Sequence, residues 1–410
     1  DERWAPSALA ELSTQGVSCL HADHEHLPDG AYDLAIVSPS FPPDHPWVRA
    51  ARDRGLSLIS ELEFGAAHWR GDLLAVTGSK GKSSVVKCLA DALCAAGRPA
   101  LPAGNYGVPL SECVLECPGR GAGSIAVTEV SSFQMEHTRT FAPRLAAILN
   151  IQADHLDRHG TLEAYARLKR RIFQAQRPEA GARAYLPWGL SPLGIRPDVP
   201  LERFGREAWV DWRHVPGAIL HKDLRIPFSG YFDNPVLGPA AALIAAMLHA
   251  CGLTPDQIAA GLTGFRPLPH RMQPIGECGG VRFVDDSKGT SLAATQAALR
   301  MVGRGVRLIA GGQLKENDLD FLDQELAACA RKAYLIGQAQ DALHAAWADI
   351  LPCQRCGDMA TAVRAAYADA APGETIHLSP GCASFDQYPG MAARGEDFRA
   401  QFLALPRPTP

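Results

Sequence analysis

The segment Thr77-Gly78-Ser79-Lys80-Gly81-Lys82-Ser83-Ser84 contains the residue types that bind a phosphate chain. Its glycines allow backbone N–H groups to turn toward an oxyanion, and Lys82 can reach the terminal phosphates. The hydroxyl of Ser83, directly after that lysine, suits Mg²⁺ as a ligand. The two glycines have two residues between them, whereas a full Walker A motif has four, so the match is to the second half of that motif. The segment predicts a site for a nucleoside triphosphate.

The flanking segments have the patterns needed to hold such a loop. Leu73 to Val76 is an apolar run typical of a buried strand, and Val85, Val86 and Leu89 follow at helical spacing. The start of a helix adds partial positive charge, which attracts phosphate. A strand before and a helix after therefore favour a phosphate loop over the simpler alternative, a glycine-rich turn with a solvated lysine.

Two potential metal ligands come directly after predicted strands. Glu129 lies at the end of the strand Ile125 to Val130, and Asp154-His155 follow the strand Leu145 to Ile151. Ligands of parallel sheets gather at the carboxyl ends of the strands, so we expect these side chains beside the phosphate loop. Oxygen ligands suit Mg²⁺, and a histidine can complete a second site. Read alone, Glu129 is a hydrogen-bonded strand-end carboxylate; with the loop and His155 it becomes a metal candidate.

Strand and helix patterns alternate along the chain, which predicts an α/β protein with mainly parallel sheets. At 410 residues the chain is too long for one core. We expect three domains, at residues 1–66, 67–267 and 268–410. The second boundary is set by Pro267 and Pro269, which interrupt regular structure. If the first domain has a nucleotide-type first strand and glycine turn, we expect them to precede Asp1.

Further elements are expected on both sides of the second boundary. The predicted strands are at 34–37, 56–59, 281–284, 306–310, 333–336 and 375–378, and the predicted helices are at 161–175, 239–251, 255–262 and 291–301.

Composition and charge restrict the class of partner. With 47% hydrophobic residues, 20% charged residues and a net charge of -4, the chain is predicted to be globular, without general attraction to nucleic acid or anionic membranes. Its eleven cysteines lie among apolar neighbours, which favours reduced, buried thiols. Cys353 and Cys356 form a C-x-x-C, but no second pair stands at zinc-site spacing. We find no signal peptide or long apolar run and expect a cytoplasmic protein.

The motifs resemble the Mur ligases in type and order. Besides the phosphate loop, the matching segments are Gly104–Gly107, Glu129–Gln134, Leu149-Asn150, Asp154–Asp157 and Leu268–Arg271. Two more segments, Asp285–Thr290 and Leu378–Tyr388, are similar to the branch of this family that adds D-glutamate to UDP-N-acetylmuramoyl-L-alanine. The resemblance extends over most of the chain from about Ser38 onward.

The resemblance implies ATP-driven amide bond formation. The substrate carboxylate attacks the γ-phosphate, the amine of glutamate attacks the resulting acyl phosphate, and phosphate leaves. A carboxylate acylates poorly until its oxygen is phosphorylated, and two anions must meet, so cationic groups are needed. The implied cofactors are ATP and Mg²⁺ at two sites. The implied partners are UDP-N-acetylmuramoyl-L-alanine, glutamate and ATP, with no nucleic acid or membrane partner, and we expect a monomer.

The resemblance also assigns domain and residue roles. Residues 1–66 would bind the UDP substrate, 67–267 ATP, and 268–410 the amino acid, the first as a nucleotide-type and the last as a Rossmann-like domain. The implied nucleotide ligands are Gly78, Ser79, Lys80, Gly81, Lys82, Ser83, Ser84, Arg271 and Asp286. The implied metal ligands are Ser83, Glu129, His155 and Lys169, and the implied catalytic residues are Lys82, Asn105, His155 and Lys169. The implied substrate ligands are Ser131, Gln134, Lys288, Thr290, Lys315, Ser384 and Phe385.

Lys169 follows Tyr165 by one helical turn, at the position where the family carries a carbamylated lysine. Carbamylation turns the cation into an anion that can bind the second Mg²⁺, whereas an unmodified lysine would repel the metal. On its sequence alone, Lys169 is one of several basic residues on a solvated helix face.

The sequence departs from the family pattern at several positions. Lys80 replaces the usual asparagine, which adds a charge beside the phosphates, and Met391 stands where the family often has an aromatic wall. We expect glutamate as the acceptor with the D-form favoured, and a related Mur-type ligase that uses L-glutamate is the alternative. The family's Gly-x-His-Asn motif is not legible in Gly230–Asn234, so no adenine contact is assigned there.

Two alternatives to this interpretation remain. One is a ligase similar to folylpolyglutamate synthetase, against which the segments Asp286–Lys288 and Ser384–Gln387 argue. The other is a nucleotide-dependent regulatory module without turnover. Retention of the phosphate-loop lysine, the two strand-end ligands and Lys169 together weighs against that module.

Overall fold

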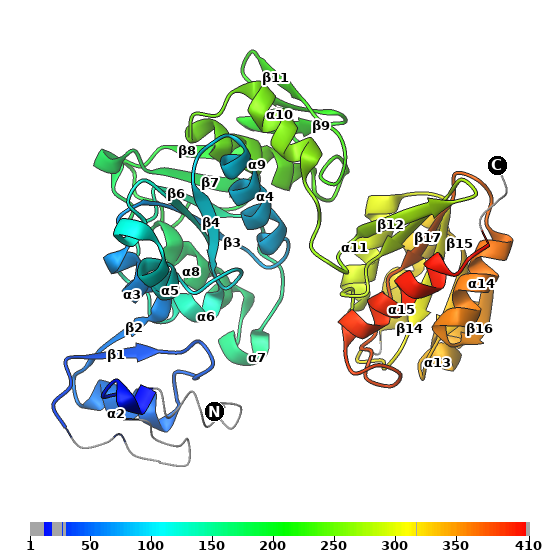
Figure 1. The fold of residues 1–410 in the computed structure, drawn as a ribbon, viewed down its shortest axis with the longest axis horizontal. Helices are drawn as coiled ribbons and strands as arrows, with labels where there is room; N and C mark the ends of the chain where they lie inside the picture. Colours follow the sequence, from blue (N-terminus) through cyan, green and yellow to red (C-terminus); the bar gives the residue numbers. More distant parts are fainter. Residues whose placement is uncertain (1–11, 19–26, 28–29, 317, 407–410) are drawn as a thin grey trace. The chain divides into compact units, whose positions relative to one another are not determined.

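The computed structural model describes residues 12–18, 27, 30–316 and 318–406. It divides into two compact units, whose elements are labelled in Figure 1. Unit 1 comprises residues 1–213, 220–225 and 242–261, and unit 2 comprises residues 214–219, 226–241 and 262–410. The described part of the chain contains no helix that is both long enough and apolar enough to cross a membrane.

Unit 1 begins with a small two-stranded parallel sheet formed by β1 (Leu34–Val37) and β2 (Ser57–Ser60). The helices α2 (Pro46–Asp53) and α3 (Glu61–His68) accompany it, and the Ser60 side chain caps α3 by accepting from the Glu63 amide. The Glu63 carboxylate in turn accepts a hydrogen bond of 3.0 Å from the Thr140 amide. The first segment is thus joined directly to the rest of unit 1.

A nine-stranded sheet has the order β11-β10-β9-β8-β7-β6-β3-β5-β4. The pairs from β4 through to β9 are all parallel. Its strands are β3 (Asp72–Thr77), β4 (Ala100–Gly104), β5 (Ile125–Glu129), β6 (Leu145–Ile148), β7 (Arg183–Pro187), β8 (Leu201–Gly205), β9 (Trp212–Val215), β10 (Ala218–His221) and β11 (Leu224–Pro227). β3 lies between β5 and β6, and Leu74 to Thr77 are buried, which explains its continuous apolar run.

The helices of this region follow the strands of the sheet. They are α4 (Lys82–Ala95), α5 (Leu110–Glu116), η1 (Pro118–Gly121), α6 (Ser132–Met135), α7 (Leu156–His159), α8 (Leu162–Arg170), η2 (Arg171–Phe173), η3 (Pro178–Ala180), α9 (Gly238–Ala250) and α10 (Pro255–Gly264). The predicted helix over 161–175 is therefore α8 followed by a 3₁₀ turn. β6 ends three residues before its predicted end, although the Leu149 amide still donates to the Thr77 carbonyl.

Unit 2 contains a six-stranded sheet of order β12-β13-β17-β14-β15-β16, parallel except for the β12–β13 pair. Its strands are β12 (Gln273–Cys278), β13 (Val281–Asp285), β14 (Val306–Gly311), β15 (Ala330–Ile336), β16 (Cys353–Gly357) and β17 (Thr375–Leu378). Its helices are α11 (Leu292–Val302), η4 (Leu319–Leu322), α12 (Asp323–Cys329), α13 (Gln340–Trp347), α14 (Met359–Asp369) and α15 (Met391–Leu403).

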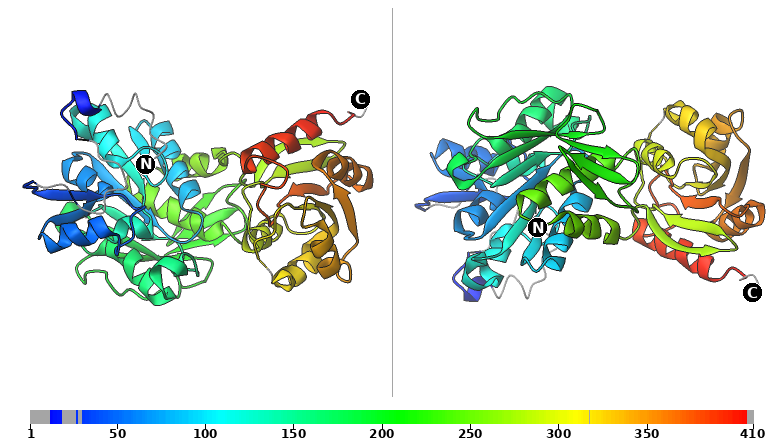
Figure 2. Two further views of the ribbon diagram at one scale, coloured as in Figure 1. Left: turned by 90° about the horizontal axis from the view of Figure 1, so that it is seen from below. Right: turned by 90° about the horizontal axis from the view of Figure 1, so that it is seen from above.

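Two apolar cores lie on opposite faces of this sheet, and Figure 2 shows helices on both of its sides. α14 and α15 contribute to one core, while α11, α12 and α13 contribute to the other. Cys353 packs against the second core and Cys356 against the first, so this C-x-x-C does not form a pair of facing thiols. Burial raises the pKa of the Cys353 thiol to about 11. The predicted α/β class with mainly parallel sheets is confirmed, whereas the predicted boundary at residue 66 stays a prediction.

Candidate active site

The phosphate loop connects the carboxyl end of β3 to the first residue of α4. Gly78 has φ 153° and Gly81 has φ 84°, backbone conformations that L side chains rarely adopt. A Cβ atom on Gly78 would lie 3.1 Å from Leu149 Cβ, and one on Gly81 would lie 3.0 Å from Leu149 Cδ2. Both glycines are therefore required by backbone conformation and by the close approach of the segment after β6.

Two lysine side chains converge on one carbonyl of the loop. Lys82 Nζ donates to Gly78 O at 2.8 Å and to Ser79 O at 3.1 Å. Lys169 Nζ donates to the same Gly78 O at 2.9 Å and to Thr77 Oγ1 at 3.3 Å. The two side-chain amino groups thus lie side by side below the start of α4, a position that attracts phosphate.

Lys169 is buried, with 1% of its surface exposed. Burial, and then the charge of Lys82, lowers its pKa to about 7, while Asp154 and Glu129 oppose that shift. Read as an ordinary solvated residue on a helix face, Lys169 would be exposed, and the structure contradicts that alternative. A large fraction of its amine is neutral near pH 7 and therefore nucleophilic.

Glu129 and Asn105 lie at the ends of neighbouring strands and contact each other. Asn105 Nδ2 donates to Glu129 Oε1 at 2.9 Å, and the Asn105 amide donates to the Glu129 carbonyl. The second carboxylate oxygen, Oε2, is buried and has no hydrogen-bond partner among the described residues. A buried carboxylate oxygen of this kind is an available ligand for a hard cation.

The donor set around Glu129 fits Mg²⁺ rather than a closed cage of protein ligands. In the described ranges, no three His, Cys, Asp or Glu side chains converge as a metal site. Mg²⁺ is usually held by one or two carboxylates together with substrate phosphates and water. Glu129 and the hydroxyl of Ser83, the second residue of α4, therefore suit this cation when nucleotide is present.

His155 immediately precedes α7 and has a left-handed backbone, with φ 54°. Its ring centroid lies 4.8 Å from that of Phe133, and its Nε2 lies 3.9 Å from Asp154 Oδ2. Lys80 Nζ lies 3.2 Å from the same Asp154 oxygen. The lysine that replaces the family's asparagine is therefore tied to the segment that carries His155.

Ser131 and Gln134 form a capping box at the start of the short helix α6. The Gln134 amide donates to Ser131 Oγ at 3.2 Å, and the Ser131 amide donates to Gln134 Oε1 at 2.9 Å. Ser131 Oγ also lies 3.1 Å from Gln134 Oε1. These two candidate substrate ligands are thus brought together, with a clear structural role in capping α6.

In unit 2, Asp286 is buried at the end of β13. Its Oδ2 accepts from Ser379 Oγ at 2.9 Å, and its Oδ1 accepts from the Met272 amide at 3.2 Å. Burial raises the pKa of Asp286 to about 7. Arg271 directly precedes Met272 and is partly exposed. Its positive charge acts to lower the pKa of Asp286.

The remaining unit 2 candidates lie on loops at the carboxyl ends of β13, β14 and β17. Lys288 and Lys315 are exposed, Thr290 is partly buried, Ser384 is buried and Phe385 is 67% exposed. Gln313 and Ala383 exchange backbone hydrogen bonds of 2.8 and 2.9 Å, which brings the loop of Lys315 beside that of Ser384.

Arg394 is a residue that motif reasoning missed. Its guanidinium is buried in unit 2 and donates to the carbonyls of Ser287, Gly311, Cys382 and Ala383. It thereby ties together the three loops that carry the unit 2 candidates. No sequence signal marks it, because an arginine in the first turns of a helix such as α15 has the pattern of a solvated residue.

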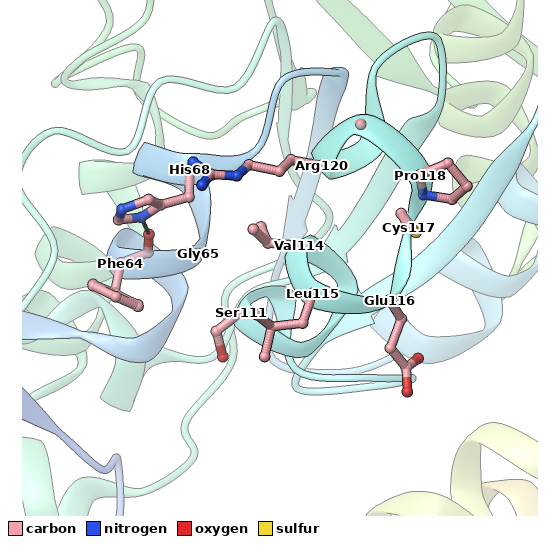
Figure 3. A pocket seen from close by; sticks show the side chains of 11 residues that line it. Phe64, Gly65, His68, Ser111, Val114, Leu115, Glu116, Cys117, Pro118 and Arg120 are labelled. Atoms are coloured by element: carbon pink, nitrogen blue, oxygen red, sulfur yellow. Dashed lines mark hydrogen bonds between the residues drawn. The ribbon is translucent and has the colours of Figure 1, made fainter. Parts of the chain in front are cut away.

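A cavity of about 600 Å³ lies between α3 and α5 in unit 1. Figure 3 shows Phe64 and His68 on one side of it and Val114 and Leu115 on the other. None of the candidate site residues, all of which lie in the described part of the chain, lines this cavity.

Two parts of the chain match models of known families. Residues 76–185 match the Mur ligase middle domain, and residues 270–382 match the Mur ligase glutamate ligase domain. A UDP-N-acetylmuramoylalanine–D-glutamate ligase of Rubrobacter xylanophilus is 39% identical, covering 95% of this chain and 88% of the relative. The ligase of the same name from Oleidesulfovibrio alaskensis is 32% identical, covering 98% and 87%.

Solved structures share the fold at lower identity. MurF from Thermotoga maritima in complex with ADP has a TM-score of 0.60 at 18% identity, covering 87% of this chain and 90% of that one. MurC from the same organism has a TM-score of 0.61 at 15% identity, covering 97% and 91%. FolC from E. coli in complex with ADP has a TM-score of 0.57 at 19% identity, covering 84% and 94%, so fold alone does not separate these classes. The relatives found by sequence do separate them, because they are named UDP-N-acetylmuramoylalanine–D-glutamate ligases and match nearly the whole chain. The chain belongs to the Mur ligase family.

Proposed function

We propose that the chain is an ATP-dependent ligase that adds D-glutamate to UDP-N-acetylmuramoyl-L-alanine in peptidoglycan precursor synthesis. Its curated relatives at 31–39% identity are UDP-N-acetylmuramoylalanine–D-glutamate ligases. The proposal rests on two features of unit 1: both lysines donate to Gly78 O, and Glu129 has a buried carboxylate oxygen without a partner among the described residues. Such a site suits phosphoryl transfer, where positioning and charge stabilisation supply most of the catalysis.

In this proposal, the residues of unit 1 bind and orient the triphosphate. Lys82 and the loop from Gly78 to Ser84, Lys80 included, contact its phosphates. Ser83 and Glu129 hold Mg²⁺, which supplies positive charge to the transferring phosphoryl group when bound. Asn105 keeps Glu129 in place through its Nδ2 hydrogen bond and lies near the reacting carboxylate. Ser131 and Gln134 contact the muramoyl substrate.

We assign a carbamate to Lys169 within the same proposal. The neutral amine attacks the carbon of CO₂, an N–C bond forms, and the nitrogen loses one proton to water, which leaves an anion. The low pKa of this amine supports the step because it makes the nucleophilic form accessible near pH 7. The product, with His155, would hold a second Mg²⁺.

The carbamate is tested by crystallography of the chain grown with bicarbonate, Mg²⁺ and ADP. We expect electron density for a carboxylate group on Lys169 Nζ. A bare amine next to an occupied metal site at high resolution would show that this assignment is wrong.

The loops of unit 2 would bind the amino acid and part of the nucleotide. Lys315, Lys288 and Thr290, with Ser384 and Phe385, would hold glutamate. A dicarboxylate needs fixed donors and at least one cation, and these loops carry two lysines. Arg271 and Asp286 would contact the nucleotide.

The function is tested by incubating the purified chain with UDP-N-acetylmuramoyl-L-alanine, ATP, Mg²⁺ and one amino acid at a time. We expect a product heavier by one glutamate residue, with D-glutamate preferred over L-glutamate. A folate substrate with L-glutamate tests the folylpolyglutamate synthetase alternative. ATP binding without any product would instead support the regulatory module.

We also propose that the enzyme acts as a cytoplasmic monomer on small-molecule substrates. Sedimentation of the active enzyme at assay concentration tests this, with a mass near 43.9 kDa expected. A dimer mass would contradict it.

A further inference from the structure

We infer that Asn150 is the positioning residue that holds the phosphate loop ready for nucleotide. This inference rests on the proposed use of the loop to bind a nucleoside triphosphate. Asn150 lies two residues after β6, in the segment that contacts the phosphate loop. None of the roles predicted from the sequence includes it. Its side chain makes three hydrogen bonds to the loop backbone.

The side-chain amide of Asn150 both accepts hydrogen bonds from the loop backbone and donates one to it. Its Oδ1 accepts from the Ser79 amide at 3.0 Å and from the Lys80 amide at 2.9 Å. Its Nδ2 donates to the Lys80 carbonyl at 3.0 Å. An oxygen that accepts from two successive backbone N–H groups fixes the peptide between them, and the third bond fixes the next peptide.

The backbone of Asn150 and the residues next to it also contact the phosphate loop. The Ser79 amide also donates to the Asn150 carbonyl at 3.1 Å. Ser79 Oγ donates to Gln152 O at 3.0 Å and lies 2.9 Å from the Gln152 amide, which can donate to it. Leu149 lies against both glycines of the loop. The residues after β6 therefore form a continuous support for the turn.

A supported loop binds phosphate better than a mobile one. The glycines of the loop leave it many backbone conformations, and nucleotide binding must otherwise supply the cost of ordering them. Asn150 orders residues 79 and 80 before the nucleotide arrives. Lys82 bonds to the Gly78 and Ser79 carbonyls, so the position of its ammonium group also depends on this turn.

The segment that contains Asn150 also leads to the candidate metal ligand His155. The same segment continues to Asp154, whose carboxylate pairs with Lys80, and then to His155. Asn150 therefore fixes the spacing between the phosphate loop and the segment of His155. Loss of its side chain is expected to weaken nucleotide binding more than it weakens the fold.

The test is the dissociation constant of Mg-ADP measured by calorimetry, with no acceptor substrate present. Asn150→Ala removes all three bonds, and Asn150→Gln keeps the amide but displaces it by one methylene. We expect the dissociation constant to rise about tenfold or more in both variants, because preorganisation is lost. The KM for ATP should rise in parallel, while the KM for glutamate stays within about twofold.

The matched control is Gln176→Ala. Gln176 is a buried amide that ties together the carbonyls of Pro143, Arg144 and Arg183, away from the loop. We expect it to lower the melting temperature and leave the dissociation constant of Mg-ADP unchanged. An unchanged constant in folded Asn150→Ala and Asn150→Gln, or the same loss in the control, would overturn the inference. Wild-type binding of Mg-ADP without ligation would overturn the proposed function instead.

Discussion

At the scale of single residues, the site depends on lysines held in unequal surroundings. Lys82 lies at the start of α4, whereas Lys169 is buried beneath the loop with its pKa lowered to about 7. Both donate to Gly78 O, yet only one of them is expected to remain a plain cation during the reaction. The two lysines therefore differ in burial rather than in residue type, and the proposed roles of phosphate ligand and carbamylation site follow from that difference.

Lys82→Ala should abolish ligation and leave the fold intact. Its ammonium bonds to two loop carbonyls rather than packing in a core, and removing one preorganised charge from a phosphoryl-transfer site costs about 10²-fold or more in kcat. Turnover and circular dichroism are measured together. Lys87→Ala, one turn further along α4 where the lysine pairs with Asp91, should keep normal turnover. Near-normal ligation by folded Lys82→Ala would remove the loop from the mechanism.

Lys315→Ala should raise the KM for glutamate about tenfold or more, because a charge-assisted hydrogen bond to one carboxylate is lost. The KM for ATP should be unchanged, since the nucleotide keeps its own cations. Lys332→Ala, at a lysine on β15 that pairs with Asp369, serves as the control. Equal effects of Lys315→Ala on both substrates would show that the glutamate pocket is misplaced.

Residue spacing in the sequence points to candidate ligands more readily than to residues that hold loops in place. Glycines, the loop lysine and strand-end carboxylates have characteristic spacing, so they could be found in the sequence. Asn150 and Arg394 act through backbone groups of loops distant in the sequence, and no spacing rule reports such contacts. Likewise, the capping box of Ser131 and Gln134 shows that a family motif can also be a local helix signal.

At the scale of elements, apolar strands inside the large sheets were predictable, whereas several strands toward the sheet edges were not. β3, β14 and β17 lie inside their sheets, so their buried runs are continuous. β7 to β11 have four or five residues each, lie toward one edge of the nine-stranded sheet and were not predicted from the sequence. The end of β6 was predicted three residues too late, because Leu149 and Asn150 contact the phosphate loop after the strand has ended.

β17 also carries a buried histidine that should make unit 2 sensitive to acid. His377 is fully buried, and among the described residues neither ring nitrogen has a partner. Burial lowers its pKa from 6.5 to about 3. Between these values the unfolded chain binds a proton that the folded chain does not, so stability present above pH 6.5 is lost as the pH falls, by at most about 1.4 kcal/mol per pH unit.

His377→Leu should therefore lower the slope of the free energy of unfolding against pH, relative to the wild type, by up to about 1.4 kcal/mol per pH unit between about pH 4.5 and 6.5. It should also remove an unsatisfied buried polar group, which favours the folded state at neutral pH. Urea unfolding at several pH values measures both effects. The raised pKa of Asp286 acts in the opposite sense, since its contribution is lost as pH rises toward 7, and it is common to both proteins.

His68→Leu, at an exposed position on α3, is the control and should leave the pH dependence as in the wild type. If His377→Leu shows the wild-type slope across this range, His377 is not the group that titrates on unfolding.

At the scale of the whole molecule, the chemistry is divided between two units. The candidate nucleotide and metal ligands belong mostly to unit 1, and the candidate amino-acid ligands belong to unit 2. Alternation of strands and helices predicted the α/β class of both. The number of compact units is decided by contacts that no local pattern contains, so the predicted division into three domains remains to be tested.

In the proposed reaction, an acyl phosphate links cleavage of ATP to amide formation. Its most direct test uses UDP-N-acetylmuramoyl-L-alanine with ¹⁸O in the alanine carboxylate, together with ATP, Mg²⁺ and D-glutamate. If the carboxylate attacks the γ-phosphate, one labelled oxygen leaves with the phosphate when the amine displaces it. We predict one ¹⁸O atom in each released phosphate, measured by mass spectrometry. Product formation with unlabelled phosphate would contradict the account.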